Sequence, residues 1–101
     1  MPIIGRFILA LAKILEIALS LYMWIIIARA VLSWVNPDPY NPIVRFIHNV
    51  TEPVLQQVRR RLPLAYAGID FTPILVLLAI VFLQTFLVGS MMDIARGLLL
   101  P

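Results

Sequence analysis

Residues 33–42 read SWVNPDPYNP and separate two strongly apolar parts of the chain. Three prolines fall within six residues, and each one lacks a backbone N–H and pushes the preceding residue towards extended geometry. The stretch therefore predicts that a first helix ends near Trp34, an aromatic residue suited to a membrane interface. Asn41 can then cap a new helix, with Pro42 at its first position. Two separate helices are predicted on either side of a rigid turn.

The composition is that of a small integral membrane protein. Of the 101 residues, 62% are hydrophobic and 13% are charged, which is more apolar side chain than a domain of this size can bury. Residues 71–92 are an uncharged run. As a helix this run spans about 33 Å, enough to cross a hydrocarbon core of about 30 Å. Because the chain has no cysteine, disulfides and thiolate metal sites are excluded.

The first helix is predicted over residues 1–35, with an amphipathic start and a transmembrane span at about 14–35. Arg29 is the charge that this span has to accommodate. A charge within an apolar span is costly and by default indicates a partner, for which Glu52 and Asp70 are the candidates. The alternatives are that Arg29 snorkels to lipid headgroups or contacts a ligand directly.

The same region also fits a secretory signal peptide. An early basic residue precedes an apolar stretch, and the small-x-small pattern ARA at residues 28–30 precedes a possible cleavage point. Cleavage after Ala30 would leave a remnant with a single span. We therefore expect the segment to be retained as a helix.

Residues 36–70 are predicted to form the proline-rich turn and two short amphipathic helices, at about 42–50 and 52–62. The sequence Thr51-Glu52-Pro53 places a capping residue, an acid and a first-turn proline between them. Each helix has one apolar face, so both are expected to lie in the membrane interface.

The second span is predicted over residues 71–93, followed by a short tail at 94–101. A turn through Gly68 and Asp70 leads into it, with Pro73 in its first turn. Thr85 and Gly89 form a small-xxx-small pair that permits close contact between helices, and Gln84 can add an interhelical hydrogen bond. The predicted fold is an all-α membrane hairpin of two spans.

Basic residues gather between the two spans, notably Arg59, Arg60 and Arg61. They can bind anionic headgroups or act as a topology signal on a solvated face. The positive-inside rule weakly favours a cytoplasmic position for residues 36–70.

An ordered set of motifs in residues 29–84 resembles the YggT (YlmG-like) family of small membrane proteins. The matching residues are Arg29, Ser33, Trp34, Asn41, Pro42, Thr51, Glu52, Pro53, Arg59, Arg60, Gly68, Asp70 and Pro73. Many relatives have further prolines near residues 57 and 64, where this chain has glutamine and leucine. The resemblance implies a multi-pass protein of the bacterial cytoplasmic (inner) membrane, with no established catalytic activity and no cofactor.

Family members are linked to cell or organelle division, nucleoid distribution and osmotic tolerance, and in plastids to cytochrome maturation. The leading interpretation is a non-catalytic membrane scaffold or assembly factor. It would act through oligomerisation, or as a subunit of a membrane complex, and through contact with anionic lipid, without binding nucleic acid directly. The alternatives are an oligomeric channel or osmotic transport component, and an accessory factor for cytochrome or haem protein maturation.

The sequence gives little support for an enzyme or a metal protein. It has no serine–histidine–acid set, no glycine-rich phosphate loop and no metal-ligand spacing. His48, the one histidine, is placed on the polar face of its helix, and haem ligation would normally need a second ligand. We therefore expect no catalytic residue and no metal site.

Overall fold

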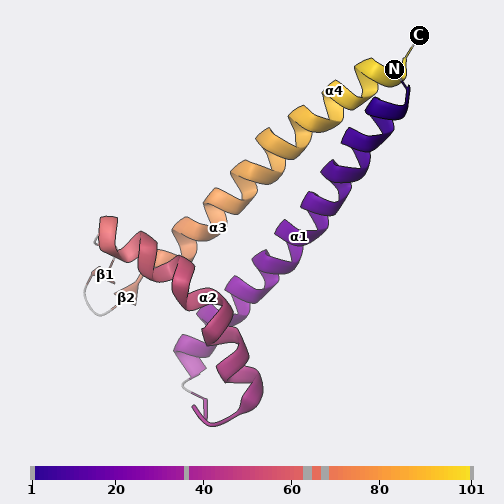
Figure 1. The fold of residues 1–101 in the computed structure, drawn as a ribbon. Helices are drawn as coiled ribbons and strands as arrows, with labels where there is room; N and C mark the ends of the chain where they lie inside the picture. The colour runs from indigo at the N-terminus through magenta and orange to yellow at the C-terminus, as the bar shows by residue number, and fades with distance from the viewer. Residues whose placement is uncertain (1, 36, 63–64, 67–68, 101) are drawn as a thin grey trace. The chain divides into compact units, whose positions relative to one another are not determined.

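The computed structural model describes residues 2–35, 37–62, 65–66 and 69–100. Residues 65–66 and 69–70 are described through their backbone, and the predicted turn residue Gly68 lies outside the described residues. The chain divides into two compact units, Met1–Tyr22 with Ala79–Pro101, and Met23–Leu78. Figure 1 shows the helices and strands named below.

The first unit is a pair of antiparallel helical segments. The N-terminal part of α1 (Pro2–Val35) lies beside the last segment of the chain, so the first and last described turns lie at the same end of the pair (Figure 1). The side chains buried between the segments are small or β-branched, namely Ala12, Ile80, Val88 and Ala95. Such side chains allow helix backbones to approach closely.

A close approach between the two segments occurs at Gly5. A Cβ atom added there would lie 3.1 Å from the Ala95 carbonyl oxygen, from Leu98 Cβ and from Leu99 Cγ. The missing side chain is therefore a packing requirement. This glycine, and not the predicted pair of Thr85 and Gly89, brings the two helical segments of the unit together.

The second apolar helix is continuous from Thr72 to Leu99. It consists of α3 (Thr72–Phe82), a π-helical segment η1 (Leu83–Val88) and α4 (Gly89–Leu99). The helix thus continues to Leu99, through most of the range 94–101 that was predicted as a short tail. Asp93 and Arg96 lie three residues apart, 3.7 Å between Oδ1 and Nη1, and such a pair stabilises a helix instead of ending it.

Both long helices are apolar enough to cross a membrane by length and composition. Within their most apolar windows, only 11% of the α1 residues and 17% of the Thr72–Leu99 residues are buried in the chain. A core helix of a soluble protein would be mostly buried. The predicted all-helical class with two apolar helices is confirmed, and it is consistent with a membrane protein.

The second unit contains the end of α1, α2 (Pro42–Arg61), and a two-stranded antiparallel ribbon that leads into α3. In the ribbon, β1 (Ala65–Tyr66) pairs with β2 (Ile69–Asp70), Ala65 opposite Asp70. The helix starts follow the sequence prediction. The Asn41 side chain accepts a hydrogen bond from the Ile43 N–H at 2.9 Å, Pro42 opens α2, and Pro73 lies in the first turn of α3.

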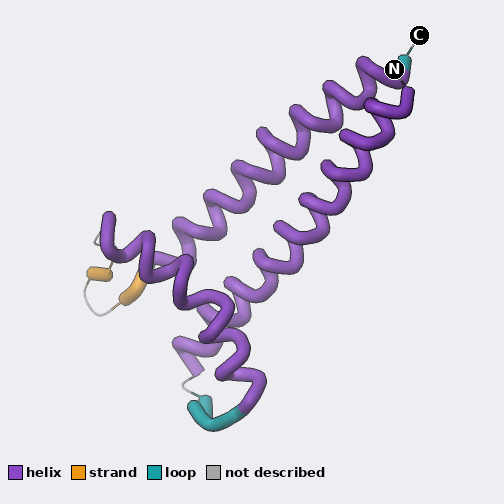
Figure 2. The backbone as a smooth tube through the Cα atoms, viewed as in Figure 1, coloured by secondary structure: helices purple, strands orange, loops and turns teal. Residues whose placement is uncertain are grey.

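α2 is one helix where the sequence predicts two, and Pro53 lies within it. Proline inside a helix removes a hydrogen bond and clashes with the preceding turn, costing about 3 kcal/mol. Thr51 sits in the affected turn with its hydroxyl donating to the Ile47 carbonyl at 2.7 Å, a contact that often bends helices. Figure 2 shows that the tube of α2 changes direction along its length, so the proline bends this helix without ending it.

Gly5→Leu should lower the free energy of unfolding by about 1–3 kcal/mol, because the new side chain overpacks the contact with α4. Gly97→Leu is the matched control, since a Cβ at Gly97 meets nothing within 4 Å and leucine favours a helix more than glycine does. Denaturant unfolding of the detergent-solubilised protein, followed by circular dichroism, measures both. Equal stability of the two variants would contradict the assigned contact.

Candidate functional site

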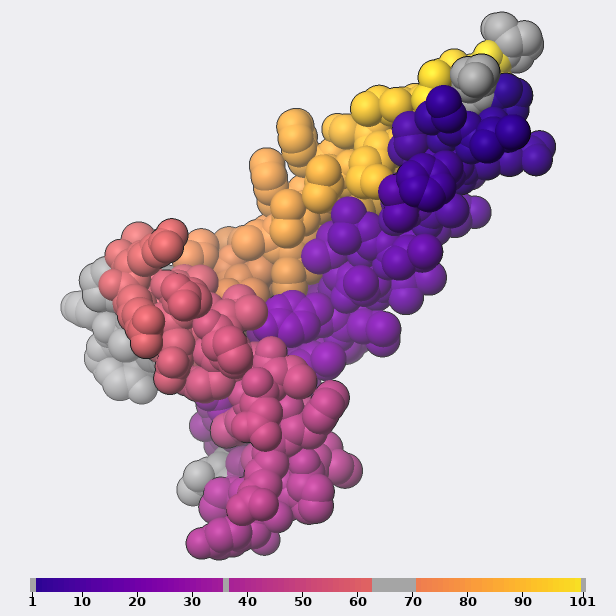
Figure 3. All heavy atoms as spheres, in the orientation of Figure 1, coloured from indigo at the N-terminus to yellow at the C-terminus, as the bar shows by residue number. Residues whose placement is uncertain are grey.

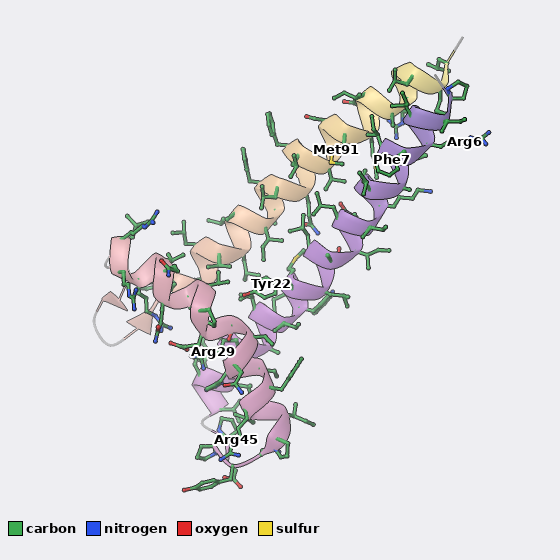
Figure 4. All side chains as sticks on the ribbon, in the orientation of Figure 1. Arg6, Phe7, Tyr22, Arg29, Arg45 and Met91 are labelled. Atoms are coloured by element: carbon green, nitrogen blue, oxygen red, sulfur yellow. The ribbon has the colours of Figure 1, made fainter. Side chains whose placement is uncertain are left out.

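Arg29 is the centre of a polar cluster where α1 meets α2 (Figure 4). Its Nη2 atom donates to Glu52 Oε2 at 2.8 Å, and its Nη1 atom lies 2.6 Å from His48 Nε2 and 3.0 Å from Nδ1. The Arg29 side chain is only 15% exposed. Of the two partners predicted for Arg29, Glu52 is in contact with it, while Asp70 is described through its backbone alone.

Glu52 also binds a second arginine. Its Oε1 atom accepts a hydrogen bond from Arg59 Nη1 at 3.1 Å, while Oε2 is occupied by Arg29. The carboxylate therefore bridges α1 to a residue two turns further along α2. Since Glu52 directly precedes Pro53 and Arg59 follows it, the pair between these two residues spans the proline within α2, while the pair with Arg29 fixes α2 to α1.

The side of α2 that contacts α1 carries both apolar and polar residues. Val44, Thr51 and Leu55 are buried on one face, and helical spacing places His48 on the same stripe with Glu52 beside it. The apolar side chains Ile43 and Phe46 lie on another side of α2 and are 69% and 58% exposed. The polar face that carries His48 thus contacts α1, while Ile43 and Phe46 stay exposed.

His48 is the member of the cluster that the sequence interpretation missed. A guanidinium has no lone pair, so the imidazole must be the acceptor, and the shorter distance indicates Nε2. The contact uses the histidine as a positioning partner of Arg29. Its spacing of four residues from Glu52 was the available signal, because residues four apart share a helix face.

The remaining predicted residues lie apart from this cluster. In the last turn of α1, the Ser33 hydroxyl donates to the Ala30 carbonyl at 2.7 Å and Trp34 is exposed. At the start of α2, the guanidinium carbon of Arg45 lies 5.9 Å from the centroid of the Tyr40 ring. Arg60 and Arg61 are exposed at the end of α2.

The three residues predicted for helix contact divide between two faces of the Thr72–Leu99 helix. Gln84 Nε2 donates to Ser20 Oγ on α1 at 3.1 Å, so it makes an interhelical hydrogen bond. Thr85 is exposed, and a Cβ atom at Gly89 would meet nothing within 4 Å. The small-xxx-small pair therefore faces away from α1 within this chain.

The chemistry of the cluster is that of a structural ion-pair network. Arginine is always charged and its planar group makes two directed contacts here. Across the described ranges, no group of three His, Asp or Glu side chains could hold a metal ion. The cluster can therefore position helices through charge.

These features define a small helical protein with two apolar helices and a charged junction between α1 and α2. The chain belongs to the CCB3/YggT family, whose model matches residues 8–91. The family resemblance drawn from the motifs is confirmed.

Relatives are known from several bacteria, and no catalytic family is indicated among them. The chain is 31% identical to YggT of Escherichia coli K12 over 81 residues, which cover 80% of this chain and 42% of the relative. It is 35% identical to a protein of Haemophilus influenzae, over 82% of this chain and 42% of the relative. It is 28% identical to a protein of Pseudomonas aeruginosa, over 87% of this chain and 47% of the relative. All three are described as uncharacterised. The chain spans less than half the length of these relatives, and no solved structure matches it.

Glu52→Gln should lower the free energy of unfolding by about 1–3 kcal/mol. This range lies between the values for exposed and buried ion pairs, since Arg29 is nearly buried and Glu52 is half-buried. A double-mutant cycle with Arg29→Gln should give a coupling of similar size, whereas the cycle with the more exposed Arg59 should give less than about 1 kcal/mol. Additive losses for Glu52 and Arg29 would contradict the pairing.

His48→Leu should be more destabilising than His48→Gln. Leucine removes the acceptor for Arg29 Nη1, and a hydrogen bond to a charged group contributes about 1.5–3 kcal/mol. Glutamine keeps a carbonyl acceptor and should lose under about 1 kcal/mol. Chemical denaturation of the two variants beside wild type measures the difference, and a leucine variant as stable as the glutamine variant would rule out this role.

Proposed function

We propose that the chain is a non-catalytic scaffold or assembly factor of the bacterial cytoplasmic membrane. Its two apolar helices span the bilayer, and α2 lies in the membrane interface. The observation that carries the proposal is the two-sided character of α2. One side is fixed to α1 through Arg29 and Glu52, while Ile43, Phe46 and Val54 on the same helix are exposed.

An exposed apolar face beside two spans is what an interfacial helix requires. Such helices bury their apolar face at the boundary between headgroups and acyl chains. The ion pair with Arg29 fixes which face of α2 points outward, so the apolar side chains are presented at a set orientation. In that position, α2 would occupy area in one leaflet, which supports roles that depend on membrane shape, such as division or nucleoid placement.

The charge at the end of α2 supports contact with anionic lipid. Of the three arginines predicted to bind lipid, Arg59 is engaged with Glu52, while Arg60 and Arg61 are exposed. Exposed basic residues beside an anionic surface are attracted to it. Lipid contact is therefore assigned mainly to Arg60 and Arg61, with Arg59 acting as a structural residue.

Replacing both Arg60 and Arg61 by alanine should weaken the preference for phosphatidylglycerol over phosphatidylcholine. Each residue contributes about 1 kcal/mol, so the relative association constant should fall by roughly 30-fold. Spin-labelled lipids in mixed nanodiscs measure this constant on the full chain. The double lysine variant keeps both charges and serves as the control. An alanine variant with wild-type preference would remove the lipid-contact function from this end of α2.

A further inference from the structure

One face of the helical segment formed by η1 and α4 is left uncovered within the first unit. Phe82, Thr85, Gly89, Met92 and Arg96 follow each other at spacings of three and four residues, which places them on one side of a helix. They line a groove of about 460 Å³ together with Asp93. These six residues are called the outer face below.

The packing inside the chain uses the opposite side of this helix. Val88 and Ala95 are buried, Gln84 binds Ser20, and Figure 4 shows Met91 on the side towards α1. The outer face thus has no contact role in the first unit. In Figure 3, side chains from this part of the chain, coloured light orange, stand clear of the surface.

Gly89, like Gly97, is not explained by the packing of the chain itself, but Gly89 belongs to the outer face. At Gly5 an added Cβ would press against Ala95, Leu98 and Leu99, whereas at Gly89 it would meet nothing within 4 Å. Glycine inside a helix is destabilising by roughly 0.5–1 kcal/mol relative to alanine. A glycine that faces lipid allows the backbone of a second helix to approach closely.

The rest of the outer face is shaped around Gly89. Phe82 and Phe86 stack with ring centroids 5.4 Å apart, yet they are 60% and 62% exposed. Phe82 directly precedes the π-helical segment Leu83–Val88, Phe86 lies within it, and the segment ends directly before Gly89. π-helical segments alter the register of a helix face and frequently mark functional positions. Here the aromatic pair lines one side of the groove, next to Gly89.

Two opposite charges lie at the other end of the outer face. Asp93 and Arg96 are both exposed and only 3.7 Å apart, so neither side chain has its charge buried within the chain. Copies that insert with the same orientation lie parallel. A twofold axis along this face then brings Asp93 of each copy to Arg96 of the other, which makes the charge pattern self-complementary.

We infer that the outer face is the contact between two copies of this chain, packed in parallel through Gly89 and registered by reciprocal Asp93–Arg96 pairs. This inference rests on the proposed function, because parallel lateral contact requires both copies in one bilayer. It adds the surface and the register through which the scaffold self-associates.

Cysteine cross-linking in native membranes tests the contact, and the chain has no cysteine of its own. Thr85→Cys on the outer face should give a cross-linked dimer. Leu87→Cys is the control, because Leu87 is exposed at a similar depth but lies outside the outer face. Gly89→Leu added to Thr85→Cys should abolish the dimer, since the leucine fills the groove, while a Cβ at this position meets nothing within 4 Å of its own chain.

Charge exchange separates a contact between copies from a role within one copy. Asp93→Arg alone and Arg96→Asp alone, each with Thr85→Cys, should lower cross-linking by about tenfold, because like charges then face each other. Co-expression of these two variants should restore cross-linking. One copy then has arginine at positions 93 and 96, and it faces a copy that has aspartate at both positions. Neither variant recovers its own internal pair, so recovery can come only from contact between copies.

Several outcomes would overturn the inference. They are equal cross-linking at positions 85 and 87, insensitivity to Gly89→Leu, no recovery on co-expression, or a monomer that retains phospholipid in native mass spectrometry. The lipid preference of α2, measured on the same preparations, keeps the two proposals distinguishable. A normal preference without the cross-link would reject the dimer contact alone, while loss of the preference would reject the proposed function.

Discussion

The ion pair between Arg29 and Glu52 is the interaction on which the second unit depends. It joins α1 to α2 at 2.8 Å, and the same carboxylate holds Arg59 across the turn that contains Pro53. An arginine in an apolar helix needs a partner, and a helix with an internal proline needs other contacts to offset the lost hydrogen bond. One glutamate meets both needs. The orientation of α2, including the exposure of Ile43 and Phe46, follows from that anchoring.

The two units are held by different kinds of contact. In the first unit, Gly5, Ala12 and Ala95 allow backbones to pack closely, with one hydrogen bond between Gln84 and Ser20. In the second unit, charged side chains join α1 to α2. Close packing of small residues needs no charge and suits a lipid environment, whereas an ion pair suits the junction where an interfacial helix would meet headgroups and water. α1 takes part in both, with its small residues early and its arginine late.

Much of the fold could be predicted from local sequence, because prolines and apolar runs act locally. The end of α1, the cap at Asn41 and the two long apolar helices are examples. The continuity of α2 could not be predicted in this way, because Thr51-Glu52-Pro53 has the residues of a helix start. The contacts that Glu52 makes with Arg29 and Arg59 exist only in the folded chain. His48 was assigned to a solvated face because polarity alone does not show which face meets another helix. The π-helical segment has no local signature, and the choice of Gly5 over Gly89 for close packing requires the three-dimensional partner.

The contact of Gly5 with Leu98 and Leu99 has a consequence for anything joined to this chain. It holds the first and last turns of the described chain next to each other, at the same end of the helix pair (Figure 1). A domain fused at one end would therefore emerge on the same side as a domain fused at the other. Contact within the helix pair makes neighbours of two positions that are far apart in sequence. Two domains fused at these positions would therefore have a high effective concentration relative to each other.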